Sequence, residues 1–250
     1  MPPTDPVPWP TDPWFPARPP TQDELPYDDG EPMESDKHRL QMWLLCECAR
    51  RGIAPELNAY AAGNMGLYYT TLQAKKNEFK APDFFVVLGA EPGLRKSWVI
   101  WDEGRAPDLV VEILSPSTER EDRGRKMSIY ARGIRVPEYY LFDPYANTVE
   151  GYQLDTATLN YAPMERQADG GFCSNVIGLR LVVWHGHYFG QQSDWLRLAY
   201  PDGTLVPTDE EHSAWAARQA EAEKSRAEAE KSRADRLAEK LRALGIDPEA

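Results

Sequence analysis

The 250-residue sequence predicts an α/β or α+β domain that is followed by a long C-terminal helix. The main observation is a strand, a helix and a second strand within residues 106–143, which is the pattern of a right-handed βαβ unit in a partly parallel sheet. Short apolar stretches on both sides of this unit, separated by turn residues, predict further strands. A repeated heptad near the end of the chain predicts the long helix.

The first part of the chain divides into a proline-rich segment and a helix. Residues 1–32 contain 11 of the 22 prolines, so we expect a disordered arm there rather than regular helix or central strand. From about Ser35 the apolar residues recur on one helical face, with Ser35 or Asp36 as the N-cap and Gly52 as the stop. The stretches "GLYYTTLQA", "FFVVLG" and "SWVIW" then predict short strands.

The central unit begins with the strand "DLVVEIL", which ends because Pro116 keeps Ser115 extended. Thr118 and Glu121 have the spacing of a capping box, and Gly133 is a suitable end for the helix that follows. The next strand is "EYYLFD". After it, "TVEGYQL", "LNYAPM" and "GLRLVVWHGHYF" predict a meander of further strands.

The C-terminal segment predicts one helix from residue 210 to about residue 244, with the heptad "EAEKSRA" occurring twice in succession. Ala220, Ala227 and Ala234 share one stripe, but Glu223 and Glu230 fall on the complementary stripe, which opposes a strong coiled coil. A solvated helix and a helix that forms homo-oligomers through residues 210–244 are therefore equally good interpretations. The expected domains are the arm at 1–32, a folded domain at 33–208 and a charged helical tail at 209–250.

Composition limits the class of protein without identifying it. The net charge of −12 is mostly peripheral, because residues 1–32 hold seven acids against Arg18 alone and residues 209–250 hold 11 acids against 8 bases. The charge therefore does not exclude a DNA partner. Three cysteines without a zinc-finger spacing indicate neither a disulfide framework nor a structural zinc. We expect a cytoplasmic protein with no membrane partner, because neither a signal peptide nor a long apolar run is present.

Three carboxylates occupy apolar strands, where an unpaired charge is costly. Asp108 and Glu112 share one face of "DLVVEIL" but lie roughly 13 Å apart along the strand, too far for both to hold one ion easily. Asp83 begins the neighbouring stretch "DFFVV" and is the more natural partner for Glu112. Two such carboxylates suit Mg²⁺ or Mn²⁺. The alternative is that these acids cap strand ends or meet arginines.

The motifs "APDFFVV", "APDLVVEILSPST", "DRGRKMSIY" and "ARGIRVPEYYLFDP" together resemble the Uma-type restriction endonuclease family of the PD-(D/E)XK nuclease superfamily. The similarity runs over residues 27–200, and the "PDLVVEILSPS" block is specific. The resemblance implies a restriction-endonuclease-like mixed β-sheet flanked by helices, and metal-dependent hydrolysis of DNA.

Carried over residue by residue, the resemblance makes Asp83 and Glu112 the metal-binding acids. The signature lysine is absent, because Leu114 stands at its position, and Lys126 on the following helix is the candidate substitute. Lys126 also lies four residues after Asp122, so a simple helix ion pair is the alternative. Asp108 would hold a second metal or orient the first, and the basic run that includes Arg123 and Arg125 would contact DNA.

Two functions follow as hypotheses. The first is a Mg²⁺-dependent or Mn²⁺-dependent DNA endonuclease that uses Asp83, Glu112, Lys126 and Asp108. The second is a catalytically silent nuclease-fold protein that binds nucleic acid or a protein through its C-terminal helix. The histidines at positions 38, 185 and 187 are interpreted as structural, since one is isolated on a helix and two alternate with aromatic residues in a strand.

Overall fold

The computed structural model describes residues 18–25, 35–76 and 80–243, and the chain divides into two compact units, Met1–Val206 and Pro207–Ala250. Residues 1–17 and 26–32 of the predicted arm lie outside the described residues. The part of the arm that is described differs from the expected disorder, because Leu25 is buried against Tyr68 and Val99. Trp101 Nε1 also donates a hydrogen bond to the carbonyl of Pro20 (3.0 Å).

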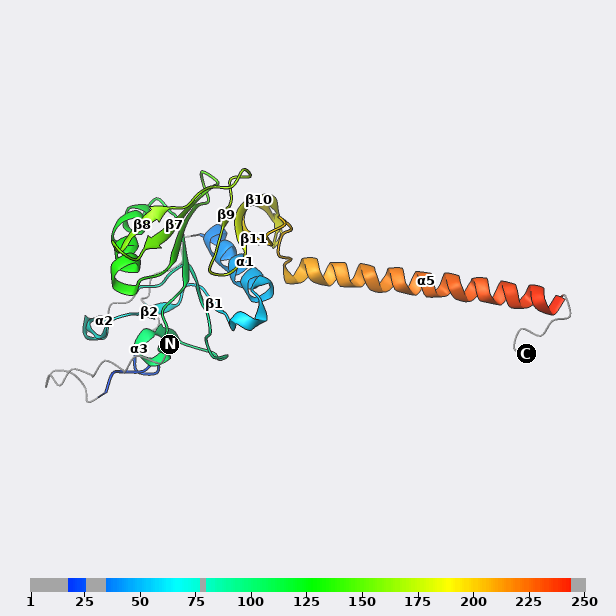
Figure 1. The fold of residues 1–250 in the computed structure, drawn as a ribbon, viewed down its shortest axis with the longest axis horizontal. Coiled ribbons are helices and arrows are strands. Elements are labelled where there is room, and N and C mark those ends of the chain that lie inside the picture. Colours follow the sequence, from blue (N-terminus) through cyan, green and yellow to red (C-terminus); the bar gives the residue numbers. More distant parts are fainter. Residues whose placement is uncertain (1–17, 26–34, 77–79, 244–250) are drawn as a thin grey trace. The chain divides into compact units, whose positions relative to one another are not determined.

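The first unit is a mixed α/β fold (Figure 1). Its helices are α1 (Asp36–Gly52), η1 (Pro55–Leu57), α2 (Thr71–Lys76), α3 (Ile100–Glu103), α4 (Glu119–Glu121), η2 (Asp122–Lys126) and η3 (Ile129–Ile134). Its strands are β1 (Tyr60–Ala62), β2 (Gly66–Tyr68), β3 (Phe84–Val87), β4 (Ser97–Val99), β5 (Leu109–Ile113), β6 (Glu138–Asp143), β7 (Thr148–Asp155), β8 (Asn160–Pro163), β9 (Phe172–Cys173), β10 (Arg180–Tyr188) and β11 (Gln191–Ala199).

The central sheet has six strands in the order β1-β3-β5-β6-β7-β8. Only the β5–β6 pair is parallel, and the other neighbours are antiparallel. The segment between β5 and β6 is therefore the crossover of the predicted βαβ unit. A second sheet has the order β11-β10-β9, and β2 pairs with β4 in a short parallel ribbon. The predicted fold class, a mixed sheet with flanking helices and a long C-terminal helix, is confirmed.

Two hydrophobic clusters cover the two faces of the central sheet. Leu109, Val111 and Ile113 of β5 pack in a cluster with α1 and the β9–β11 sheet. The alternate residues Val110 and Leu114 pack in the other cluster, which includes β2, β4 and the crossover helix. Because side chains alternate along a strand, Glu112 is directed toward this second layer. The sheet thus presents one acid to the helix that crosses over it.

The crossover helix, which we call the 119–134 helix, runs continuously through α4, η2, residues 127–128 and η3, and much of it is π-helical. It starts after Thr118 as predicted, but no capping hydrogen bond comes from that side chain, whose hydroxyl lies 3.0 Å from Ser115 Oγ. It ends at Ile134, one residue beyond Gly133, where Arg135 adopts the left-handed conformation.

Other predictions were met in part. The helix at 36–52 has Ser35 as its N-cap, and the side chain of Ser35 accepts a hydrogen bond from His38 N (3.2 Å). The stretches predicted as whole strands at 66–74 and 97–101 each contain a three-residue strand, and helix then begins at Thr71 in the first and at Ile100 in the second. In the first, Gln73 Oε1 accepts hydrogen bonds from the backbone N–H of Tyr69 and Thr70, which satisfies donors at a helix start.

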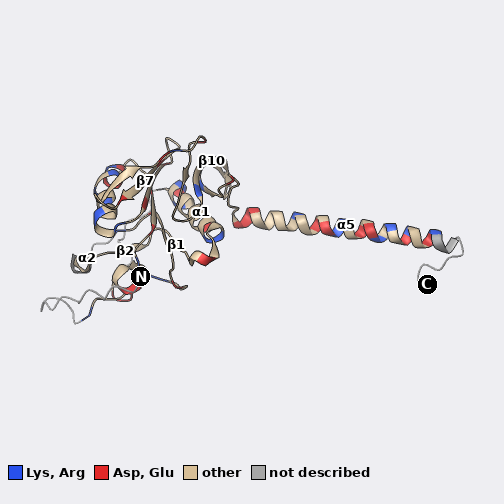
Figure 2. Cartoon of the chain, viewed as in Figure 1, with Lys and Arg blue, Asp and Glu red and all other residues tan. Residues whose placement is uncertain are grey.

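The second unit contains α5 (Asp209–Ala243), a helix whose acidic and basic residues are interspersed along its length (Figure 2). Trp215 and Leu237 are exposed on it. Among the described residues, no helix is both long enough and apolar enough to span a lipid bilayer.

Candidate metal-dependent site

Asp83 and Glu112 lie opposite each other on neighbouring strands. The β3–β5 register pairs Phe84 with Val111, so Asp83, immediately before β3, stands across from Glu112. The backbone N–H of Asp83 donates to Glu112 Oε2 (3.2 Å), and the N–H of Ile113 donates to Asp83 Oδ2 (2.7 Å). Directly opposed residues in an antiparallel pair lie side by side, and the carboxylate of Glu112 points to the side of the 119–134 helix.

The 119–134 helix supplies two donors to Glu112. Lys126 Nζ lies 3.1 Å from Glu112 Oε2, and the Tyr130 hydroxyl donates to Glu112 Oε1 (2.7 Å). Leu114, where the family signature has lysine, is instead buried in the apolar layer on the same face of β5. The ammonium group therefore reaches Glu112 from the helix rather than from the strand.

Asp122 holds Lys126 from the other side. Its Oδ1 lies 2.8 Å from Lys126 Nζ, in the i,i+4 relation expected from the sequence. Asp122 is buried, and Lys126 supplies the charged partner of its carboxylate. Lys126 is thus placed between two buried acids, so the helix ion pair and the contact with Glu112 exist together.

The charges in this cluster depend on one another. Burial raises the pKa of Glu112 to about 8 against the opposing effect of Lys126, and the nearby Asp83 adds to the rise. Burial also works to raise the pKa of Asp83, but the hydrogen bond and charge of His38, together with Lys126, hold that pKa below its ordinary value. The surrounding acids keep the pKa of Lys126 above its ordinary value despite burial. Burial therefore dominates the pKa of Glu112, whereas the partners of Asp83 dominate its pKa.

His38 is a member of this cluster that the sequence did not indicate. Its Nε2 lies 2.8 Å from Asp83 Oδ1, and both side chains are largely buried. An ionised carboxylate only accepts hydrogen bonds. In the pair with ionised Asp83, Nε2 of His38 is therefore protonated and donates the hydrogen bond. His38 was interpreted as structural because it stands alone on a helix, and the only local signal was its position in the first turn after the N-cap Ser35.

Three residues predicted for the site lie outside this cluster. Asp108 is at the other end of β5, where its Oδ2 accepts a hydrogen bond from Leu88 N (2.7 Å) and so caps the end of β3. Arg123 forms ion pairs with Glu119 and Glu150, both at 2.8 Å. Arg125 is exposed on the outer side of the 119–134 helix. The structure therefore unites Asp83, Glu112 and Lys126 and leaves Asp108 in a backbone-capping position.

The donor set fits a hard divalent cation. The side chains of Asp83 and Glu112 supply oxygen donors from adjacent strands, which Mg²⁺ and Mn²⁺ prefer. A carboxylate oxygen has two acceptor positions, so Asp83 Oδ1 and Oδ2 each keep one after bonding His38 and Ile113. No group of three or more His, Cys, Asp or Glu residues in the described parts of the chain could hold an ion by itself. Water or phosphate oxygens must complete any coordination here.

The chain is similar to a family model, to a curated protein and to a solved structure. The model of the Uma2 family, described as "Putative restriction endonuclease", matches residues 15–181. The chain is 39% identical over 64 residues to "Uncharacterized protein slr1290" of Synechocystis sp., a match that covers 24% of this chain and only 34% of that protein's length. The crystal structure of a "putative nuclease belonging to DUF820" from Anabaena variabilis has a TM-score of 0.43 and 20% identity, and the match covers 62% of this chain and 88% of that one.

Proposed function

We propose, on the premise that this chain belongs to the Uma2 family of restriction-endonuclease-type proteins, that it is a metal-dependent endonuclease that hydrolyses DNA phosphodiester bonds. The observation that carries the proposal is the placement of Asp83 and Glu112 on opposed strand positions with the ammonium of Lys126 beside them. A buried cluster of this kind is unfavourable for stability alone, because two carboxyl groups and an ammonium group are largely withdrawn from water in one place.

Asp83 and Glu112 would hold Mg²⁺ or Mn²⁺, which when bound neutralises phosphate charge and acidifies a water molecule. The Tyr130 hydroxyl fixes Glu112 through Oε1, and His38 fixes Asp83 through Oδ1. Such hydrogen bonds to metal-binding side chains orient them and tune their basicity.

Lys126 supplies the positive charge at the reacting phosphate. Its ammonium group lies 3.1 Å from Glu112 Oε2, and Asp122 Oδ1 contacts the same ammonium group at 2.8 Å. A cation next to a phosphate oxygen stabilises the negative charge that grows there in the transition state. Lys126 therefore takes the part that a lysine at position 114 would have in the family signature.

The test is cleavage of supercoiled plasmid and of single-stranded DNA by the full chain in Mg²⁺, Mn²⁺ or EDTA. We expect cleavage with either ion and none in EDTA, and a loss on the order of 100-fold or more for Glu112→Gln. Glu138→Gln is the matched control: Glu138 is also a fully buried strand glutamate, but Tyr140 and the backbone N–H of Asn175 are its partners, and it should retain cleavage.

A wild-type chain that cuts no DNA with any ion would contradict this proposal. The catalytically silent binding module would then be the better function, and the specific observation in its favour is the leucine at position 114. Binding of DNA without cleavage, unaffected by Glu112→Gln, would be its signature.

A further inference from the structure

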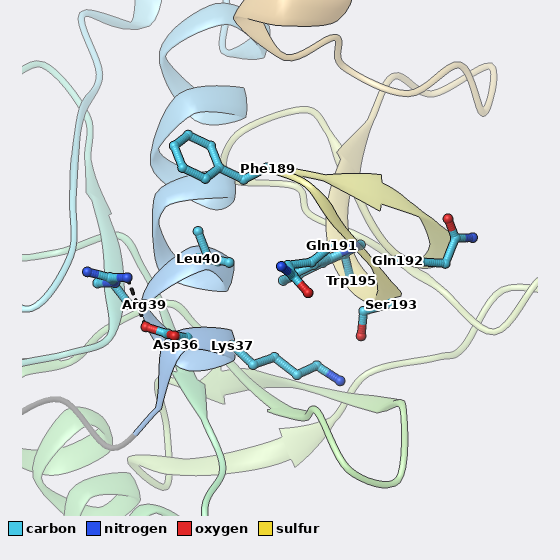
Figure 3. Close-up of a pocket in the computed structure, with 9 residues that line it drawn as sticks. All are labelled: Asp36, Lys37, Arg39, Leu40, Phe189, Gln191, Gln192, Ser193 and Trp195. Carbon is cyan, nitrogen blue, oxygen red and sulfur yellow. Dashed lines mark hydrogen bonds and ion pairs between the residues drawn. The ribbon is translucent and has the colours of Figure 1, made fainter.

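A pocket of about 460 Å³ opens between the first turns of α1 and the beginning of β11 (Figure 3). Its walls come from Asp36, Lys37, Arg39 and Leu40 on one side and Phe189, Gln191, Gln192, Ser193 and Trp195 on the other. None of these residues belongs to the Asp83–Glu112–Lys126 cluster. Lys37 and Arg39 nevertheless flank His38, which is bonded to Asp83, so the pocket and the candidate site share the first turns of one helix.

One exposed aromatic ring lines this pocket, and a second exposed ring packs against the first. Phe189 lines it and is 66% exposed, and Trp43, one turn further along α1, is 43% exposed. Their ring centroids are 6.4 Å apart with an angle of 67° between the planes. The guanidinium of Arg39 lies over the Trp43 ring, 5.2 Å from its centroid. Aromatic faces and an arginine left in solvent together are the components of a base-stacking platform.

The backbone conformation at Phe189 is one that an aromatic residue does not favour. Phe189 and Gly190 form the two-residue connection between β10 and β11, with φ angles of 49° and 79°. Such a turn favours Asn, Asp or Gly at its first position, and a bulky residue with positive φ is strained. Strain of this kind at an exposed position points to a role for the side chain outside folding.

The polar groups of the pocket suit a flat, neutral ring better than a phosphate. Gln191 and Ser193 face it from alternate positions of β11 and provide both donors and acceptors, while Leu40 and Trp195 provide apolar walls. The charged groups at the pocket already have partners: Asp36 pairs with Arg39 (2.9 Å), and Lys37 Nζ donates a hydrogen bond to the carbonyl of Pro144 (2.5 Å). The volume lies within the range of small-ligand sites, which is roughly 300–1,000 Å³.

From this geometry we infer that the pocket takes an unpaired nucleobase of the DNA strand, which stacks on Phe189 and Trp43. The inference rests on the proposed function and narrows its substrate to DNA with at least one unpaired nucleotide near the reacting phosphate. A base inside a duplex has both faces covered by its neighbours, so only an unpaired or extruded base presents a face to an aromatic side chain.

The test measures binding by fluorescence anisotropy in EDTA, with a labelled single-stranded oligonucleotide of mixed sequence and with the same strand in a perfect duplex. Phe189→Asn removes the ring and places a residue that tolerates positive φ, so its melting temperature should be equal to or above that of the wild type. We expect affinity for the single strand to fall on the order of tenfold, with a smaller fall for the duplex. Trp43→Leu should act in the same direction.

Trp215→Leu is the control, because it removes an exposed aromatic residue of α5 in the second unit. Unchanged single-strand affinity in Phe189→Asn and Trp43→Leu, an equal loss for duplex and single strand, or no single-strand binding by the wild type would each overturn the inference. A change from dimer to monomer in these variants without a change in affinity would make the patch a self-association surface, which also overturns it. Plasmid cleavage by the wild type tests the proposed nuclease function separately. Cleavage can be observed although the pocket variants bind single strands normally, and the pocket can bind single strands although no plasmid is cleaved.

Discussion

Lys126 Nζ lies 3.1 Å from Glu112 Oε2, although the two residues are 14 positions apart and belong to a helix and a strand. The same ammonium lies 2.8 Å from Asp122 Oδ1 on its own helix. One cation therefore connects two buried acids, and any substitution of Lys126 changes both pairs. This coupling decides how its role can be tested.

Replacing Lys126 by methionine should lower the single-turnover cleavage rate by on the order of 100-fold or more, because one charge contact to the transition state is lost. The same variant should be destabilised by about 3 kcal/mol, since Glu112 and Asp122 would be left buried without their cation. Rates measured at a temperature well below the melting transition, beside a urea titration, separate the two effects.

Lys80→Met is the control for this variant. Lys80 lies outside the 119–134 helix and forms an ion pair with Glu121 of that helix at 2.6 Å. This pair is more exposed than the pairs of Lys126. Its loss should change the free energy of unfolding by less than about 1 kcal/mol and leave the cleavage rate near the wild-type value. Near-normal cleavage by Lys126→Met would show that Lys126 is a structural residue only.

The raised pKa of Glu112 predicts how stability depends on pH in the metal-free protein. The folded state holds the proton of Glu112 up to a pKa of about 8, whereas the unfolded chain releases it near the ordinary glutamate value. The stabilising contribution of protonated Glu112 to the free energy of unfolding is therefore complete below the pKa that Glu112 has in the unfolded chain. This contribution is lost as the pH rises through the folded-state pKa of about 8. The difference in free energy of unfolding between wild type and Glu112→Gln should fall across this window, by at most about 1.4 kcal/mol per pH unit.

Urea titrations of both proteins in EDTA at pH values from 5 to 9 measure this difference. Asp83 does not interfere, because its pKa is held below the ordinary value and it is ionised throughout this range. A difference that stays constant from pH 5 to 9 would mean that Glu112 is ionised in the folded protein at neutral pH.

His38→Ala should weaken binding of Mn²⁺ by 10-fold to 100-fold, which is the usual effect of removing a hydrogen bond to a metal-binding side chain. The physical reason is that Asp83 Oδ1 loses the donor that fixes its orientation. Calorimetric titration with Mn²⁺ measures the affinity directly, independent of DNA. His185→Ala, which removes an exposed histidine paired with Asp194, should leave it unchanged.

The sequence was sufficient to predict the βαβ unit and the pairing of Asp83 with Glu112, because alternation along a strand and the position of two acids are local properties. The β3–β5 register places Asp83 across from Glu112, and their joint binding of an ion stays a prediction. The contact of His38 with Asp83 was beyond prediction, since it joins positions 45 residues apart that no spacing rule relates.

Local hydrogen bonds explain where strand predictions failed. The apolar content of residues 97–101 indicates a strand, yet Gly104 in the left-handed conformation accommodates a short helix at 100–103. Asp108 was expected to hold a second metal or to orient the first, but its carboxylate accepts a hydrogen bond from the backbone N–H of Leu88 at the end of β5 opposite Glu112. Which end of a strand meets a catalytic group depends on the neighbouring strand, which sequence alone does not place.

Gly63→Ala should displace the backbone of Asp83 and so weaken the candidate site. A Cβ at this glycine would lie 2.3 Å from the backbone carbonyl oxygen of Asp83 and 2.4 Å from the side chain of Met42, so the β1–β2 connection or β3 must shift. Overpacking of this kind costs about 1–3 kcal/mol. Because Asp83 itself is displaced, affinity for Mn²⁺ should fall together with the melting temperature.

Gly124→Ala is the matched control, because no atom lies within 4 Å of the added Cβ. Alanine in place of a helical glycine should stabilise the protein by roughly 0.5–1 kcal/mol without changing its affinity for Mn²⁺. A Gly63→Ala protein that melts lower but binds Mn²⁺ as tightly as the wild type would show that the ion does not depend on the position of Asp83.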